Sequence, residues 1–187
     1  VEQKQFLFSN IIEQKSNLSQ LWHIPLNIQT PLSSKETRTS FNKEKELLTI
    51  AKDTKSNNPT ANWVKINPEQ TGFFRVNYND NNWESLHNAI AEKLLPPADR
   101  VGLQNDAFSL SKSGLIPITR FLNMCSAYKG ETNAIVWQDL CSNLKSIGHQ
   151  LSNTSHEKAF NMFVGSLLDS IKLKVNWTPT KSDKHLD

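Results

Sequence analysis

The sequence is poor in the features that mark nucleotide-binding, membrane-spanning and zinc-dependent proteins. Its 187 residues include only six glycines, none of them clustered, whereas a phosphate-binding loop needs several glycines close together. No apolar run approaches the roughly 20 residues of a membrane span. No His-Glu-x-x-His motif is present to bind zinc. The sequence therefore predicts none of these three kinds of site.

The nearest approach to a zinc motif is His156-Glu157, in which Phe160 stands where the second His is required. A single His cannot make a zinc site, so we interpret the pair as the first turn of a helix, where Glu is favourable. Neither a G-x-S-x-G motif nor a cysteine-protease signature occurs. The five His are far apart in sequence, which leaves open a triad assembled only by folding. The prediction is a chain without catalytic or metal-ligating residues.

Charge is nearly balanced, with 21 Lys plus Arg against 18 Asp plus Glu, and the basic residues are scattered. Nucleic-acid binding usually requires clustered Lys and Arg, so this pattern argues against it. Hydrophobic residues make up 37% of the chain, with five Trp and nine Phe, which is too apolar for a disordered segment. A folded protein is expected.

The two cysteines, Cys125 and Cys141, fall on apolar faces of predicted helices. Such thiols are typical of reduced core residues in an intracellular protein, although the sequence also permits a disulfide. Glycosylation sequons begin at Asn17, Asn153 and Asn176. They matter only in a secreted protein, and in a chain this rich in Asn, Ser and Thr three such triplets are close to chance.

Short strand signals dominate residues 1–79. The segments with apolar and β-forming residues are 5–8, 21–30, 38–42, 47–50, 63–66 and 72–78. The last has the strongest strand character because of its β-branched and aromatic content. The polar stretch 53–62 predicts a loop. This spacing of short strands predicts a small antiparallel β-sandwich over residues 1–79.

From residue 80 the apolar period changes from about 2 to about 3.6, which marks a change from strand to helix. Five amphipathic helices are predicted, and their proposed inward residues are Trp83, Leu86, Ile90 and Leu94; Leu103, Ala107 and Leu110; Ile118, Phe121, Leu122 and Cys125; Ile135, Trp137, Leu140, Leu144, Ile147 and Leu151; and Ala159, Met162, Phe163, Leu167 and Ile171. Short links favour side-by-side helical hairpins, as in an α-solenoid, over residues 80–187. The polar residues 177–187 supply no capping helix, so we expect an incomplete array within a fragment of a multidomain protein.

Two charged features have both functional and structural interpretations. Asp99-Arg100 and Asp106 lie in the second predicted helix, with the two Asp residues on one face. They suit either a carboxylate pair with a substrate-binding Arg or, as we favour, helix capping plus an interhelical salt bridge. Arg75 lies opposite to Phe74 and Val76 along the predicted strand. It suits a ligand carboxylate or, as we favour, an ion pair at a domain interface.

Three segments carry a family resemblance. Residues 63–78, WVKINPEQTGFFRVNY, resemble a strand pair of the gluzincin aminopeptidases, the family that includes aminopeptidase N. Residues 95–110, LPPADRVGLQNDAFSL, and residues 136–144, VWQDLCSNL, resemble most the cytosolic, puromycin-sensitive branch of that family. The opening residues 3–6 are similar to the segment that follows its catalytic domain.

The resemblance implies a β-sandwich followed by the first helices of a large helical domain that arches over the active site. The family's G-x-M-E-N motif, its HExxH-x18-E zinc site and its oxyanion-stabilising Tyr have no matching position in this chain. The resemblance therefore implies a zinc-dependent parent protein in the cytoplasm, and no activity in this chain alone. The implied partners are zinc, bound by the parent, the peptide substrate and the other domains of the parent. The structural or interdomain candidates are Gly72, Phe74, Arg75, Tyr78, Asp99, Arg100 and Asp106.

Two roles follow as hypotheses. In the first, the sandwich sets the angle of the helices, the helices form part of a wall around the peptide, and motion at residues 78–83 gates entry. In the second, the chain is an autonomous protein- or peptide-binding module without a peptidase role. A soluble, monomeric chain with two-state unfolding favours the second.

Overall fold

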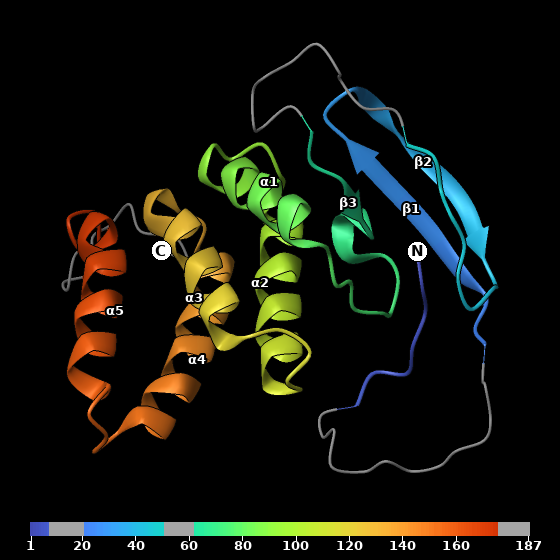
Figure 1. The fold of residues 1–187 in the computed structure, drawn as a ribbon. Coiled ribbons are helices and arrows are strands. Elements are labelled where there is room, and N and C mark those ends of the chain that lie inside the picture. The colour runs from blue at the N-terminus through green and yellow to red at the C-terminus, as the bar shows by residue number, and fades with distance from the viewer. Residues whose placement is uncertain (8–20, 51–61, 176–187) are drawn as a thin grey trace.

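The structure is a computed structural model that describes residues 1–7, 21–50 and 62–175. Its β-rich part lies on one side of the molecule and its helices form the other (Figure 1). The five α-helices are α1 Asp80–Ala91, α2 Pro97–Lys112, α3 Ile118–Ser126, α4 Ala134–Leu151 and α5 Glu157–Lys172. Two short 3-10 helices are also described: η2 Pro68–Gln70 precedes α1, and η3 Ala127–Gly130 lies between α3 and α4. The predicted change from strands to helices is confirmed.

The helix ends follow from local chemistry. The side chain of Asn79 accepts a hydrogen bond from the Asn82 backbone N–H at 2.9 Å and so caps α1. Pro97 occupies the first turn of α2, where its missing N–H costs nothing. Gly114, with φ 75°, follows the end of α2 in the left-handed conformation that favours glycine. The helix therefore ends just before the only residue type that adopts this conformation without strain.

One apolar core joins all five helices. Its buried members include Trp83 and Leu86 of α1, Leu103 of α2, Leu140 of α4 and Leu167 of α5. The helices α3 and α4 both pack on α2, and α5 packs on α4. Trp63 precedes β3 in the chain, but its side chain is also buried in this helical core. The helices and residue 63 are therefore packed as one unit.

Five predicted inward residues are exposed instead, namely Leu94, Ile118, Ile135, Ala159 and Met162. Leu94 lies beyond the end of α1, where Lys93 has a φ of 57° and interrupts the helical period. Ile135 lies in the first turn of α4. On α5 the prediction is confirmed at Phe163, Leu167 and Ile171, which belong to or pack against the core, and it is wrong at Ala159 and Met162.

The sheet has three antiparallel strands in the order β2-β1-β3. Strands β1 Ile24–Thr30 and β2 Ser33–Phe41 form a hairpin in which Ile24 lies opposite Phe41, and β3 Lys65–Ile66 pairs with the other edge of β1. Leu26, Ile28 and Phe41 are buried in the sheet's own core. In place of the predicted two-sheet sandwich, the described residues contain one small antiparallel sheet.

The strongest predicted strand, residues 72–78, is wrong as a strand assignment. These residues form no ladder with β3 or with any other described strand. Their backbone is bound by side chains instead, because the Val76 N–H donates to the Asp106 carboxylate of α2 at 3.1 Å. The short runs 5–7 and 47–50 also lie outside the strands, although Glu2 forms an isolated bridge with Lys45.

Some predictions fall outside the described residues. These are Phe8, most of the polar loop at 53–62, the sequons at Asn17 and Asn176, and the polar end at 177–187. The remaining sequon residue, Asn153, is exposed in the turn between α4 and α5. Both Cys125 and Cys141 are free thiols.

Candidate functional site at the junction of β3 and α2

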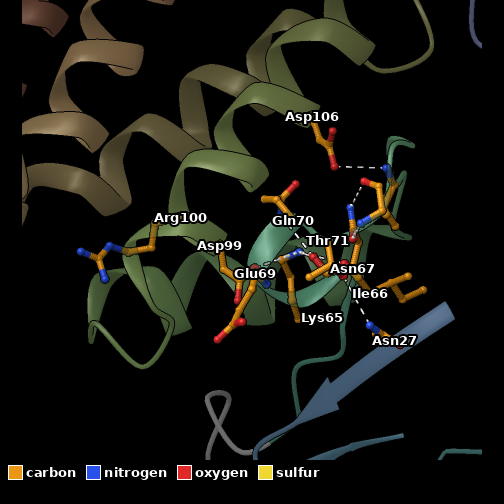
Figure 2. Close-up of polar contacts among 12 residues, drawn as sticks. Asn27, Lys65, Ile66, Asn67, Glu69, Gln70, Thr71, Asp99, Arg100 and Asp106 are labelled. Carbon is orange, nitrogen blue, oxygen red and sulfur yellow. Dashed lines mark hydrogen bonds and ion pairs between the residues drawn. The ribbon is translucent and has the colours of Figure 1, made fainter. Parts of the chain in front are cut away.

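The polar side chains singled out in the sequence gather where the β3–α1 connection, residues 67–79, crosses α2. Figure 2 shows Asp99 and Asp106 on the side of α2 that faces this connection, while Arg100 points away from it. The separation of seven residues places the two carboxylates on one helix face, two turns apart. Each accepts a backbone N–H from the connection and pairs with a basic residue of residues 65–75.

The first of these arrangements is the Asp99 cluster, which consists of Lys65, Glu69 and Asp99. The Glu69 N–H donates to Asp99 Oδ1 at 2.7 Å, and Lys65 Nζ lies 3.4 Å from the same oxygen. The side chains of Lys65 and Asp99 are 1% and 0% exposed. Lys65 Nζ also donates to the carbonyls of Ile66 and Asn67 at 2.8 and 2.9 Å. Three acceptors thus surround one buried ammonium group.

Burial lowers the pKa of Lys65, because removal from water disfavours the charged form, while Asp99 and Asp106 act in the opposite direction. Asp99 Oδ2 is buried without a hydrogen-bond partner. A nearby cavity of about 310 Å³ is lined by Trp63 and Val64, not by Lys65. Because Lys65 is buried and does not line this cavity, it is suited to stabilising the fold rather than to attacking a substrate.

The second arrangement is the Asp106 cluster, which consists of Arg75, Val76 and Asp106. The Val76 N–H donates to Asp106 Oδ2 at 3.1 Å, and Arg75 Nη1 donates to Asp106 Oδ1 at 3.2 Å. The same Nη1 donates to Asn105 Oδ1 at 2.7 Å, and the guanidinium lies 5.4 Å from the centre of the Phe6 ring. Burial raises the pKa of Asp106 to about 6, against the opposing effects of Val76 and Arg75.

Between the two clusters the backbone is folded tightly. Asn67, Glu69 and Gln70 all have φ values of 57° to 59°, in the left-handed region that costs energy for residues other than glycine. The Asn67 side chain accepts from the Gly72 N–H at 2.7 Å and donates to the Gly72 carbonyl at 2.9 Å. The turn is therefore held by its own Asn and, at Glu69, by Asp99.

Two glycines allow this turn to lie close to its neighbours. A Cβ atom on Gly72 would lie 2.3 Å from the Phe74 ring, and one on Gly102 of α2 would lie 2.0 Å from Gln70 Nε2. Gln70 therefore rests on α2 at the position where the helix has no side chain. Its amide donates to the Asn67 carbonyl at 3.3 Å, so the notch at Gly102 helps to fix the turn.

The outer edge of the sheet beside β3 is bound by side chains in place of a further strand. The amide of Asn82 accepts from the Val64 N–H and donates to the Val64 carbonyl, both at 2.8 Å. The Tyr78 hydroxyl accepts from the Ile66 N–H at 3.0 Å and donates to its carbonyl at 3.3 Å. Because this edge is already hydrogen-bonded, it offers little to a pairing strand. Burial raises the pKa of Tyr78 far above its ordinary value.

Arg100 belongs to a separate buried contact. Its Nε and Nη2 donate to the two carboxylate oxygens of Glu131 at 2.7 and 3.0 Å, and Nη1 donates to the Leu95 carbonyl at 2.6 Å. The Glu131 carboxylate also accepts the backbone N–H groups of Thr132 and Asn133, just before α4. This contact connects α2 to the start of α4, and it does not join Arg100 to Asp99.

The seven predicted candidates are thus distributed over three places. Asp99 binds the start of the connection at Glu69. Gly72, Phe74, Arg75 and Tyr78 belong to the connection, and Asp106 binds it at Arg75 and Val76. Arg100 lies in the separate buried contact with Glu131. Sequence reasoning missed Lys65, Asn82 and Glu131. For Lys65 a signal existed, because strand alternation places residues 63 and 65 on the same face. Trp63 and Lys65 are indeed both buried.

The arrangement offers no metal centre within the described residues, since no three His, Cys, Asp or Glu side chains come together there. The His156-Glu157 pair begins α5, and Glu157 accepts the Asn153 N–H at 2.8 Å. His87 Nε2 lies 3.0 Å from Ser126 Oγ, but that hydroxyl donates to the Asn123 carbonyl at 2.7 Å. Its proton is therefore already engaged and the pair is not an activated nucleophile.

None of the helices in the described part of the chain is long and apolar enough to cross a membrane. At the junction of β3 and α2, the charged side chains and the backbone groups form hydrogen bonds and ion pairs with one another, which is typical of a structural connection.

Comparison with known proteins places these residues in a protein family. The family model described as "ERAP1-like C-terminal domain" matches residues 63–187. Its match begins at Trp63, the residue that contributes to the helical core from before β3.

Among curated proteins, the chain is similar to Aminopeptidase M1 of Arabidopsis thaliana, with 32% identity over 148 residues. It is 34% identical over 149 residues to Glutamyl aminopeptidase of Homo sapiens, and 31% identical over 132 residues to Aminopeptidase 2 of Candida albicans. These matches cover 76%, 76% and 69% of this chain, but only 17%, 15% and 14% of the relatives. The chain therefore spans about one sixth of the length of the proteins that it matches.

Proposed function

Because this chain belongs to the family of ERAP1-like C-terminal domains, we propose that it is a non-catalytic part of a zinc aminopeptidase that removes N-terminal residues from peptides. The observation that carries the proposal is the junction of β3 and α2, where buried ion pairs join the β-rich part to helices matched by the family model. The chain contributes shape and support. The described residues hold no set of zinc ligands, so zinc is assigned to other parts of the parent.

In this proposal the chain divides into a β-sandwich unit of residues 1–79 and a helical unit of residues 80–187. The sandwich unit is a spacer that sets the angle of the helices, and the helices are part of a wall around the peptide. Support comes from the side-by-side packing of α2 with α3 and α4, and of α4 with α5 (Figure 1). The Asp99 and Asp106 clusters support this role, because each binds the connection to α2, at Glu69 and at Val76.

The finer assignment is to the puromycin-sensitive, cytoplasmic branch of the gluzincin family. It is supported by the resemblance of residues 95–110 and by the free thiols of Cys125 and Cys141. The candidate interdomain residues remain the seven of the sequence analysis, and the partners are the other domains of the parent and its peptide substrates.

A chimera tests the central proposal. The segment of Arabidopsis Aminopeptidase M1 that matches this chain is replaced by the chain, and hydrolysis of an aminoacyl arylamide is measured. We expect the chimera to retain activity, and a matched chimera with Asp99→Ala to lose much of it, because the buried Lys65 ammonium then lacks its partner. A folded, inactive wild-type chimera would contradict the supporting role.

A second test measures zinc binding and peptidase activity of the isolated chain. We expect it to bind no stoichiometric zinc by mass spectrometry and to release no arylamine. Bound zinc or turnover would overturn the proposal that this chain is non-catalytic.

The wall and gating roles have their own test. Residues 79–83 are replaced by Gly and Ser in the active chimera, and turnover is measured on peptides of increasing length. A changed length preference supports gating at this link. Unchanged turnover and an unchanged length preference would contradict the gating role of this link.

A further inference from the structure

The two clusters that hold the β3–α1 connection differ in how completely they are buried. In the Asp99 cluster the Lys65 and Asp99 side chains are 1% and 0% exposed, whereas in the Asp106 cluster Arg75 and Asp106 are 30% and 9% exposed. Glu69 is tied to Asp99 by a 2.7 Å hydrogen bond, and Val76 to Asp106 by one of 3.1 Å. The Asp106 cluster has the longer backbone bond and the partner that reaches solvent.

We propose that residues 73–77 can be released from α2, and that proton uptake by Asp106 tightens their closure onto that helix. The two ends of this segment stay in place, because Gly72 is hydrogen-bonded to Asn67 and Tyr78 to Ile66. Residues 65–70 remain fixed by the Asp99 cluster. This inference concerns the chain itself and does not depend on the proposed function.

The sign follows from the geometry. In the closed state the Asp106 carboxylate is removed from water and has a single cationic contact, through one nitrogen of a partly exposed Arg75. Such a contact does not fully offset desolvation, so the neutral acid is favoured while the connection is closed. Opening returns the carboxyl group to water, where the charged form is favoured. Raising the pH therefore loosens residues 73–77, and lowering it tightens them.

The neutral acid still satisfies the closed geometry. Its carbonyl oxygen can accept from the Val76 N–H, which is the buried donor of the cluster. Arg75 keeps its 2.7 Å bond to Asn105 Oδ1 after the carboxylate is neutralised. Protonation thus removes the costly buried charge without leaving the backbone donor unpaired.

The charged and titratable groups that face Asp106 come from three elements. Arg75 and Tyr78 belong to the connection and Lys65 belongs to β3. Asp99 is on the same face of α2 and shares Lys65 with Asp106. Lys65 and Arg75 both favour the charged carboxylate, but burial outweighs them, and the pKa of Asp106 lies at about 6 instead of its ordinary 3.8.

The helices packed on α2 direct their charges elsewhere. Asp139 of α4 accepts from Gln104 Nε2 at 2.9 Å, and Arg120 of α3 is paired with Asp80. Neither group is paired with Asp106.

Hydrogen exchange on the 187-residue chain tests the inference, with protection factors corrected for the intrinsic pH dependence of exchange. The Val76 amide reports on the Asp106 cluster and the Glu69 amide on the Asp99 cluster. Between pH 5 and pH 8 we expect the protection factor of Val76 to fall about tenfold, from the two pKa values above. That of Glu69 should change much less. Equal change at both amides would overturn the inference, because it would report opening of the whole junction.

Asp106→Asn is the matched variant, since its amide oxygen can accept from Val76 but cannot titrate. We expect its Val76 protection factor to lose the tenfold pH dependence. Retention of that dependence in the variant would assign it to another group and would overturn the inference.

A direct titration keeps the inference testable if the variant does not fold. The ¹³C signal of the Asp106 carboxyl carbon in the unaltered chain should titrate with a midpoint near 6. A midpoint below the ordinary 3.8 would show a carboxylate stabilised by the closed state and would reverse the sign of the proposal.

Discussion

The helical and β-rich parts of this molecule are stabilised by different kinds of contact. The helices share one continuous apolar core that extends from Trp83 in α1 to Leu167 in α5. The sheet has a small core of its own around Leu26, Ile28 and Phe41. Between them lies the polar junction of the Asp99 and Asp106 clusters. Apolar burial is non-directional, whereas hydrogen-bonded ion pairs require a defined geometry, so the two kinds of contact constrain the chain differently.

The largest effect should come from the helical core. Phe121 of α3 is fully buried, and Phe121→Ala should lower the free energy of unfolding by about 4 kcal/mol through lost burial and a cavity. Urea unfolding followed by circular dichroism measures it. Ile118→Ala, at an exposed site on the same helix, is the matched control and should cost well under half as much. Equal losses would contradict the continuous core.

The next effect should come from the Asp99 cluster. Lys65→Met leaves the Asp99 carboxylate buried without a cation, and we expect the free energy of unfolding to fall by about 3 kcal/mol. The double variant Lys65→Met, Asp99→Asn removes the charge and keeps an acceptor for the Glu69 N–H, so it should recover more than half of the loss. A single-variant loss below about 0.5 kcal/mol would show that this ion pair does not support the junction.

The third effect depends on pH and concerns the Asp106 cluster. The pKa of Asp106 is raised in the folded state, so its contribution to stability is complete below pH 3.8 and is lost as the pH rises through about 6. From pH 4.5 to pH 7 the free energy of unfolding should fall by about 2 kcal/mol more in the unaltered chain than in Asp106→Asn. If the free energies of unfolding of the two proteins changed equally with pH, Asp106 would make no pH-dependent contribution to stability.

The smallest effect separates two helical glycines. A Cβ on Gly165 of α5 meets nothing within 4 Å, so Gly165→Ala should stabilise the chain by about 0.5 to 1 kcal/mol. Gly102→Ala should gain less or be destabilising, because its Cβ displaces the Gln70 amide. Thermal unfolding of both variants measures the difference. An equal gain at both positions would show that the contact of Gln70 with α2 contributes nothing.

The helices were predictable because each carries its own signals. Apolar residues recur at helical spacing, Asn79 caps α1, and Pro97 and Gly114 mark the limits of α2. Strand β1 and the second half of β2 were also visible, as the segments 21–30 and 38–42, but their pairing in a hairpin was not predicted. The exposed positions of Ile135 and Met162 were not predictable, since periodicity identifies a face without saying which part of it meets a neighbour.

The candidate site was predictable only in part. The sequence identified Asp99 and Asp106 as sharing a helix face, and the structure places both against the β3–α1 connection. It could not pair Asp99 with Lys65, or Arg100 with Glu131, because those partners are 34 and 31 residues away along the chain. Residues 72–78 were assigned to a strand because of their composition, yet α2 supplies the acceptor for Val76.

The sequence by itself determined the order of the elements, the apolar faces of the helices, the lack of a zinc motif and the family resemblance of residues 63–78 and 95–110. These properties are encoded locally, in spacing and in residue type. The tertiary structure alone decided which charges are buried together, how deeply, and therefore which carboxyl group has a raised pKa. Desolvation and ion pairing depend on distances across the fold, and no local pattern records them.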